Sequence, residues 1–323
     1  MSRSDWRLSD RWLFVLRLWP LLLPLLVLLP GLTAFPYPSP EAAYSDLSLA
    51  HYPYALYARQ SLLEQHRLPL WSPLILSGAP YAANPLSGVW YPPGWPALLL
   101  PLPLGFNLLI ILHMLWGGLG IYLLVRSEGL GHAPAFLDAI AFESMPKLFA
   151  HYGAGHLTLL YAVSWTPWLL LASKIRAKRH GSFWTWFSSW EAPLLALIFA
   201  ADVRWSLYAG LLWWGYDLCI HRSEDRAAAI APLCRLCRLA FQTVLAGLLA
   251  APLALPLWEF SRLSTRAWMS VDDVMAFSLP ISRLLGLIFP DFNGFHEYMA
   301  YVGQMVLFLA LLANSNQGVQ DTA

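Results

Sequence analysis

The chain has 323 residues, of which 58% are hydrophobic and 12% charged, and its formal net charge is +1. Soluble domains carry about 25% charged residues, so this composition excludes an ordinary soluble enzyme and a disordered chain. No lysine or arginine block is long enough to follow a nucleic-acid backbone, and three cysteines cannot form a disulfide framework. We therefore expect an all-α, polytopic membrane helix bundle.

Eight apolar runs have about the length that a helix needs to cross the hydrocarbon core, which is about 20 residues. The predicted spans are Leu13–Leu32, Trp95–Val125, Pro134–Ala150, Leu157–Ala172, Phe183–Ala200, Trp205–Ile220, Leu239–Trp258 and Tyr301–Ala313. The first run also has the basic leader and the small residue, Ala34, of a signal peptide. We favour a span, because the run is long for a signal peptide and seven further apolar runs follow it.

The distribution of basic residues predicts the orientation of the bundle. With the N-terminus in the cytoplasm, the cytoplasmic segments hold 13 of the 20 lysines and arginines, as the positive-inside rule requires. These are Arg3, Arg7, Arg11, Arg17, Arg126, Lys174, Arg176, Lys178, Arg179, Arg222, Arg226, Arg235 and Arg238. The orientation predicts a multi-pass membrane protein whose N-terminus is cytoplasmic.

Two connections between the predicted spans are long, residues 33–94 and 259–300, and both lie outside in this orientation. Loops that a rigid scaffold holds often carry function, so we expect the functional site on the outer face. The expected organisation is one transmembrane domain, residues 1–313, followed by a polar tail, residues 314–323.

The first outer loop combines an amphipathic helix with a proline-rich stretch. The helix is predicted at Ala55–His66, with Leu56, Leu62 and Leu63 on one side, and a helix of this kind can lie in the membrane interface. Proline and glycine recur so often over Leu68–Pro93 that they exclude a regular helix or strand there. The loop is therefore predicted to form a rigid, aromatic-rich cap.

Short motifs follow one another in a fixed order along the chain. In the first outer loop they are Asp46, Tyr52-Pro53, Leu68–Pro73, Ser77–Pro80, Ala83-Asn84 and Tyr91–Pro93. Further on they are Gly155-His156-Leu157, Trp165–Trp168, Phe289–Gly294, Glu297-Tyr298 and Tyr301–Gly303. This ordered set resembles the YfhO-type bacterial membrane proteins, which belong to the GT-C class of glycosyltransferases that use polyprenyl-phosphate sugars.

The resemblance implies a GT-C-like fold, a hexosyltransferase activity and a location in the bacterial cytoplasmic (inner) membrane. A sugar would move from a polyprenyl-phosphate donor to an envelope glycan or lipid acceptor at the outer face of the bilayer, and a divalent metal could assist. The chain departs from the family at Ser72, where an Asn is usual, and family members are more than twice as long. With the polar tail, this predicts a truncated protein.

Asp46 is the candidate general base, because GT-C enzymes place an acidic residue early in the first outer loop. From the sequence alone, an N-cap of a helix beginning at Leu47 explains Asp46 equally well, and the resemblance favours the catalytic role. His51, five residues further on, is a candidate for substrate binding. An exposed interfacial histidine beside Tyr52 is the favoured interpretation of His51.

Basic and acidic residues at the outer ends of other spans are further candidates for substrate binding. Lys147 and His156 could contact a phosphate or extend to the interface, and His151 lies between them. Asp202 and Arg204 nearly fill the turn between two spans, where they form either a local ion pair or part of the site.

Arg262 and Arg266 in the second outer loop are four residues apart, so one helix would place both on the same face. They could bind phosphate, and a solvated amphipathic helix explains them at least as well. Asp272-Asp273 and the Cys234/Cys237 pair are too weak as patterns to assign any metal ligand.

Ionisable residues inside a span usually face the interior of the bundle or a cavity. Asp138 and Glu143 are such residues, in a span that Pro146 could break. Gly117, Gly118 and Gly120 are predicted to permit close helix packing.

Two other functions fit the sequence. A transporter or flippase would show internal repeats and broken helices near the middle of the membrane, and no clear repeat is present. An inactive fragment is favoured by the polar C-terminal residues. The sequence does not identify the sugar, the acceptor or the stereochemistry.

Overall fold

The protein is all-helical over the residues that the computed structural model describes, which are 19–22, 45–75, 77–177, 189–224, 232–276, 278–290, 298–304 and 306–309. Within these residues the one extended pairing is the bridge between Ser72 and Ala79. The predicted all-α class is therefore confirmed for this part of the chain. The predicted tail, residues 314–323, lies outside it.

Long helices form the body of the molecule and short ones the connections. The α-helices are α2 (Tyr52–Arg59), α3 (Leu102–Ser127), α4 (His132–Glu143), α5 (Pro146–Gly153), α6 (Leu157–Ala177), α8 (Glu191–Ala201), α9 (Val203–Glu224), α10 (Pro232–Leu249), α11 (Ala251–Arg262) and α12 (Val271–Met275). π-Helical turns η3 (Leu47–His51) and η4 (Gln60–Glu64) flank α2. The 3-10 turns are η1 (Trp19–Leu22), η5 (Tyr81–Ala83), η6 (Pro85–Ser87), η7 (Pro92–Leu99), η8 (Thr265–Trp268) and η9 (Ile281–Leu287).

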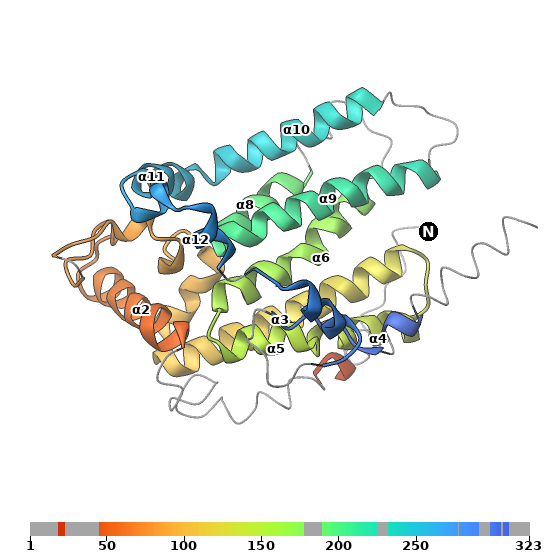
Figure 1. Cartoon of the computed structure of the whole chain (residues 1–323), viewed down its shortest axis with the longest axis horizontal. Helices are drawn as coiled ribbons and strands as arrows, with labels where there is room; N and C mark the ends of the chain where they lie inside the picture. The colour runs from red at the N-terminus through yellow and green to blue at the C-terminus, as the bar shows by residue number, and fades with distance from the viewer. Residues whose placement is uncertain are drawn as a thin grey trace, which may run out of the picture.

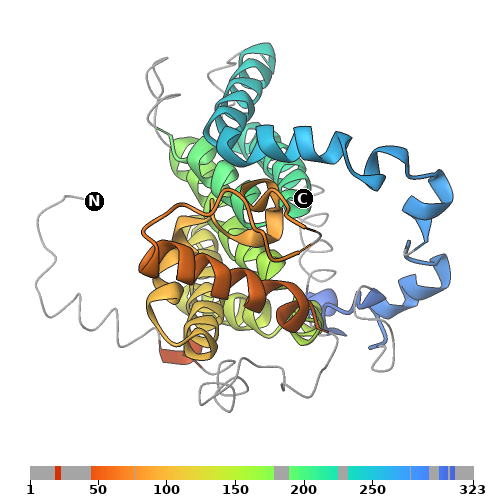
Figure 2. The ribbon, with the colours of Figure 1, turned by 90° about the vertical axis from the view of Figure 1, so that its left-hand side faces the viewer.

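Helix α6 lies at the centre of the bundle. It packs against α3 on one side and against α8 and α9 on the other, and these helices run side by side along the long axis (Figure 1). Helix α2 crosses one end of the bundle, as Figure 2 shows, and packs on α3, η6 and η7. The loop that follows α2 thus forms a cap over the end of the bundle.

The first outer loop confirms the main features predicted for it. A continuous helical segment runs from Leu47 to Glu64, beginning eight residues before the predicted start. Leu56 and Leu63 are exposed on its outer face, whereas Ala55 and Ala58 are buried against the bundle. After it, the proline-rich stretch forms only short 3-10 turns within its described residues.

Glycines on α3 allow neighbouring helices to approach closely. A Cβ on Gly117 would lie 3.2 Å from the Cα of Ser164, and one on Gly120 would lie 2.9 Å from the Cβ of Pro167. A Cβ on Gly118 would lie 1.7 Å from Oε1 of Glu143, which is fully buried on α4. The predicted packing role of these glycines is therefore confirmed.

Only part of the predicted membrane topology is supported by helix length and apolarity. Among the described residues, α3 is the single helix that is long and apolar enough to cross a membrane, and a second is formed if α10 and α11 count as one span. The axes of these two helices differ by 78°, so a straight seventh span is wrong. The described residues include only 19–22 of the first predicted span, and 301–304 and 306–309 of the eighth.

Two other predicted boundaries are also wrong, each because of proline. The predicted second span begins at Trp95, but the prolines there form the 3-10 turn η7, and α3 begins at Leu102. The predicted third span, Pro134–Ala150, is two helices, because Pro146 has no backbone N–H to continue a helix.

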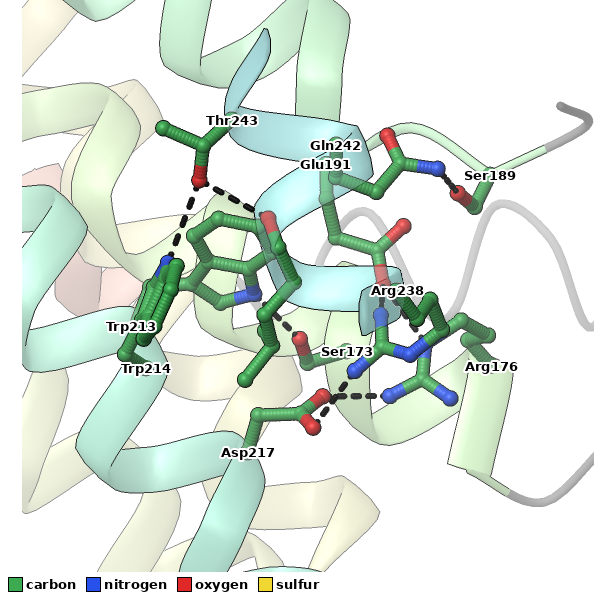
Figure 3. Close-up of polar contacts among 11 residues, drawn as sticks. Ser173, Arg176, Ser189, Glu191, Trp213, Trp214, Asp217, Arg238, Gln242 and Thr243 are labelled. Atoms are coloured by element: carbon green, nitrogen blue, oxygen red, sulfur yellow. Dashed lines mark hydrogen bonds and ion pairs between the residues drawn. The ribbon is translucent and has the colours of Figure 1, made fainter. Parts of the chain in front are cut away.

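Four charged side chains from four helices meet inside the bundle (Figure 3). One of them belongs to Arg176 in the last turn of α6, and this helix ends on the side of the bundle remote from α2 (Figure 1). Arg176 of α6 donates to Glu191 of α8 at 2.7 Å and to Asp217 of α9. Arg238 of α10 donates to Asp217 at 2.5 Å and lies 3.6 Å from Glu191. Both carboxylates are fully buried. Two positive and two negative charges thus form a neutral ionic cluster.

Polar side chains surround the ionic cluster (Figure 3). The indole of Trp213 donates to Ser173 at 2.6 Å, and Gln242 donates to Ser189 at 2.8 Å. The cluster and these neighbours join α6, α8, α9 and α10 at one level of the bundle.

We predict that Arg238→Met lowers the free energy of unfolding by about 3–5 kcal/mol, because it leaves two buried carboxylates facing only Arg176. The measurement is unfolding in mixed micelles titrated with a denaturing detergent. Arg67→Met, at an exposed position of the loop, is the control and changes stability by less than about 0.5 kcal/mol. Adding Asp217→Leu to Arg238→Met restores neutrality and recovers part of the loss. A loss for Arg238→Met no larger than that of the control would contradict the prediction.

Candidate functional site

The carboxylate of Asp46 pairs with the imidazole of His156 at the end of the bundle that α2 covers. Oδ2 of Asp46 lies 3.3 Å from Nε2 of His156, and the carboxylate side chain is 51% exposed. Asp46 precedes η3 but makes no side-chain capping hydrogen bond. The N-cap interpretation of Asp46 is therefore wrong, and its carboxylate is directed to a residue 110 positions further along the chain.

Gly155 brings the two partners together. Its φ of +82° is a conformation that residues with a Cβ rarely adopt. A Cβ at this position would lie 2.5 Å from the backbone nitrogen of Leu47. In addition, the backbone N–H of Asp46 donates to the carbonyl of Ala154 at 3.1 Å. The turn before α6 thus holds the start of η3 by backbone contact.

A second histidine continues the Asp46–His156 pair into the protein. Nδ1 of His156 lies 2.9 Å from Nδ1 of His151, which is buried at the end of α5. When Nε2 of neutral His156 donates to Asp46, its Nδ1 accepts from His151. The three side chains therefore form a chain in which the ring of His156 is fixed from both sides.

His51 is buried rather than exposed, so the favoured sequence interpretation of this residue is wrong. Only 6% of its surface is accessible, and its Nε2 has no hydrogen-bond partner among the described residues. Burial lowers the pKa of His51 from 6.5 to about 4, and the nearby negative charge of Asp46 opposes this shift only in part. His51 is thus a neutral imidazole with an unused nitrogen.

Asp202 joins the turn between α8 and α9 to α6. Its Oδ2 accepts from the hydroxyl of Thr158 at 3.1 Å and from Arg204 at 3.0 Å, and its Oδ1 accepts from the backbone N–H of Trp205. Asp202 is buried, whereas the side chain of Arg204 is 67% exposed. The expected local ion pair is confirmed, and Asp202 also caps α9 and faces the N-terminal turn of α6.

The remaining predicted residues lie elsewhere. Lys147 is half-buried in the first turn of α5. Arg262 is exposed at the end of α11, where its guanidinium lies 5.0 Å from the ring centre of Trp258. Helix α11 ends at Arg262, so the shared helix face predicted with Arg266 does not form. The side chain of Arg266 lies outside the described residues.

The structure adds groups that the sequence analysis did not select. Thr158 joins Asp202 to α6, and Glu191 and Asp217 form the ionic cluster. Glu191 and Asp217 lie inside predicted spans, so the rule that singled out Glu143 also applies to them. Thr158 has no comparable signal in the sequence.

No group of three His, Cys, Asp or Glu side chains is arranged to hold a metal ion within the described residues. Cys234 and Cys237 are exposed on α10 as free thiols.

Comparison with known protein families, curated proteins and solved structures gave no match to this chain. The resemblance to the YfhO-type proteins therefore stays a prediction from sequence motifs.

We predict that Gly155→Ala destabilises the protein by about 2 kcal/mol or more, because it combines backbone strain with a clash against Leu47. Gly153→Ala is the matched control, since nothing lies within 4 Å of a Cβ at that position. The control leaves stability unchanged or raises it slightly, as alanine is favoured within helices. Thermal unfolding of the detergent-purified variants measures both effects. Equal stability of the two variants would exclude the proposed role of Gly155.

We predict that protonation of His51 makes the fold less stable in acid. The pKa of His51 is lower in the folded chain, so the unfolded chain binds more protons between about pH 6.5 and 4. Stability is full above pH 6.5 and falls by about 3 kcal/mol as the pH decreases to 4. His51→Gln removes this part of the pH dependence, whereas His66→Asn, at an exposed position whose positive φ asparagine tolerates, retains it. Unfolding free energies measured at several pH values test the difference, and a parallel decline in both variants would refute it.

Proposed function

We propose that the protein is a GT-C-like membrane glycosyltransferase of the hexosyltransferase type, with Asp46 as its general base. The observation that supports this most directly is the pairing of a half-exposed carboxylate with a buried histidine chain. A base must accept the proton of the acceptor hydroxyl while remaining accessible to the acceptor. Asp46 meets both conditions, because His156 orients its carboxylate and about half of the side chain is open.

The reaction proposed here transfers a sugar from a polyprenyl-phosphate donor to an envelope glycan or lipid. The acceptor oxygen forms a bond to the anomeric carbon of the sugar, while the bond from that carbon to the phosphate oxygen breaks. Asp46 takes the acceptor proton, and polyprenyl phosphate leaves with the bonding electrons. Negative charge develops on the leaving phosphate, and the exposed guanidinium of Arg204, which pairs with Asp202, is a cation suited to stabilise it.

The length of α6 supports the membrane part of the proposal. The helix runs from Leu157 to Ala177, which at 1.5 Å per residue gives a length of about 30 Å, close to the thickness of the hydrocarbon core. The Asp46–His156 pair lies at its first turn and Arg176 of the ionic cluster at its last. A helix of this length with polar clusters at both ends is suited to the two faces of a bilayer, so the support from α6 is its length, whereas α3 is the described helix that is also apolar enough.

This placement agrees with the proposed orientation, in which the N-terminus is cytoplasmic and Asp46 lies outside. Basic residues at the last turn of α6 then face the cytoplasm. The eight spans, the inner-membrane location and the lipid-linked donor belong to the same proposal and rest on the sequence. An envelope glycan or lipid is the acceptor that an outer site would meet.

We expect Asp46→Asn to abolish sugar transfer without preventing membrane insertion. The assay follows the release of polyprenyl phosphate from a panel of polyprenyl-phosphate hexoses by membranes that contain the full chain. Loss of the base lowers the rate by about 100-fold or more. Glu64→Gln is the matched control, because Glu64 lies at the exposed end of the same helical segment.

Two results would contradict the proposal. One is unchanged turnover in Asp46→Asn at normal abundance in the membrane. The other is no turnover of any donor in the panel by the unaltered chain, which would favour the inactive fragment.

A further inference from the structure

A cavity lies beneath the helical segment η3–α2, inside the capped end of the bundle. Ala55 and Ala58 line one wall, Phe106 and Leu109 of α3 another, and Tyr161 of α6 a third. Its volume is about 70 Å³, whereas one water needs about 10–15 Å³. The cavity therefore has room for a ligand of about five non-hydrogen atoms or for the end of a longer one.

Two buried polar atoms at the cavity have no hydrogen-bond partner among the described residues. They are Nε2 of His51 and the hydroxyl oxygen of Tyr161, and both residues line the cavity. Each side chain is at least nine-tenths buried. An unpaired buried polar group costs roughly 1–3 kcal/mol, so two such groups at one cavity are unusual unless a ligand completes them.

The other polar side chains of the cavity wall are already paired. The hydroxyl of Thr158 donates to Asp202. The hydroxyl of Tyr91 accepts from Trp165 at 2.7 Å and shares a hydrogen bond with His113. The Ser87 hydroxyl accepts from the backbone N–H of Val89 at 3.4 Å, and the Trp95 indole donates to the carbonyl of Val89 at 3.1 Å. His51 and Tyr161 are therefore the lining side chains with an unpartnered buried polar atom, and the described wall contributes no lysine or arginine.

This pattern restricts the chemistry of the occupant. A carboxylate or phosphate would be buried without a counter-charge. A sugar would bury several hydroxyls where two partners are available. An alkane would leave both polar atoms unpaired. An aliphatic alcohol can pair both polar atoms. Its hydroxyl donates one hydrogen bond and accepts another, and its carbon chain contacts the apolar part of the wall.

We propose that this cavity binds the hydroxyl-bearing end of an aliphatic alcohol, with His51 Nε2 as hydrogen-bond acceptor and the Tyr161 hydroxyl as donor. The neutral state of His51 suits this role, since an imidazole that keeps its lone pair on Nε2 accepts a proton from a hydroxyl. The backbone of Leu86 forms a hydrogen bond with the same ring, which leaves Nε2 for the ligand. The groups that act on the charge of His51 are Asp46, His156 and Asp202.

Photolabelling of the detergent-purified full chain tests the proposal. The probe is 1-hexanol that carries a diazirine, and labelled peptides are identified by mass spectrometry. We expect labels on the peptides that contain Ala55, Ala58, Phe106 or Leu109. An excess of 1-hexanol suppresses the labelling, and hexane does not. No sugar donor is present, so the result is independent of the Asp46 experiment.

Variants test the two polar groups. Tyr161→Phe removes one oxygen and weakens hexanol binding roughly three- to tenfold, which corresponds to one hydrogen bond. His51→Phe weakens it at least as much. Tyr208→Phe on α9 is the matched control, because Tyr208 is exposed and does not line the cavity, and it leaves binding unchanged. Should His51→Phe fail to fold, Tyr161→Phe decides the question alone.

A series of alcohols separates a free small alcohol from a lipid alcohol. Tighter binding with each added carbon beyond hexanol indicates that the chain continues out of the cavity, as for a lipid alcohol, and constant binding indicates a small alcohol. Equal competition by hexane, labelling outside the lining peptides, or unchanged affinity in Tyr161→Phe would overturn the proposal. So would the absence of labelling at saturating probe, which would show that the cavity holds water only.

Discussion

The burial of α6 is the constraint on which the other features depend. Helices α3, α8 and α9 pack closely against it, and glycines on α3 remove the side chains that would otherwise separate α3 from α6. Because α6 is packed between its neighbours, its two ends are held in fixed positions relative to each other. His156 precedes its first turn and Arg176 lies in its last. The site and the ionic cluster are therefore fixed to the same rigid element, although no side chain joins them directly.

The ionic cluster and the Asp46–His156 pair differ in how far their carboxylates are exposed. In the ionic cluster, Glu191 and Asp217 are fully buried, and the two arginines neutralise them within the protein. Such a cluster is costly to break and contributes specificity of helix pairing more than net stability. Asp46 instead keeps half of its carboxylate open and has a histidine as its partner. The carboxylate of Asp46 is therefore accessible to a ligand from outside, whereas the carboxylates of the ionic cluster are enclosed by the surrounding helices. This contrast supports the proposal that the chemistry takes place at the open end.

Local patterns predicted the helical class, the breaking effect of proline and the packing role of the α3 glycines, because each depends on neighbouring residues. The contact between Asp46 and His156 depends on a long-range approach through the positive φ of Gly155, which no local pattern reveals. The burial of His51 was missed for the same reason, since its surroundings come from α3, α6 and the loop after α2. Glu191 could have been recognised, because a carboxylate inside an apolar run needs a partner.

The turn η3 connects the open surface with the cavity. A π-helical turn closes a hydrogen bond between residues five apart, and such turns are frequent at functional sites. In η3 the backbone N–H of Tyr52 donates to the carbonyl of Leu47, and this spacing places Asp46 and His51 one turn apart. The first is exposed and paired, and the second is buried with a free nitrogen. One short segment thus carries a carboxylate at the open surface and an imidazole at the cavity, and the negative charge of Asp46 acts on His51 across that segment.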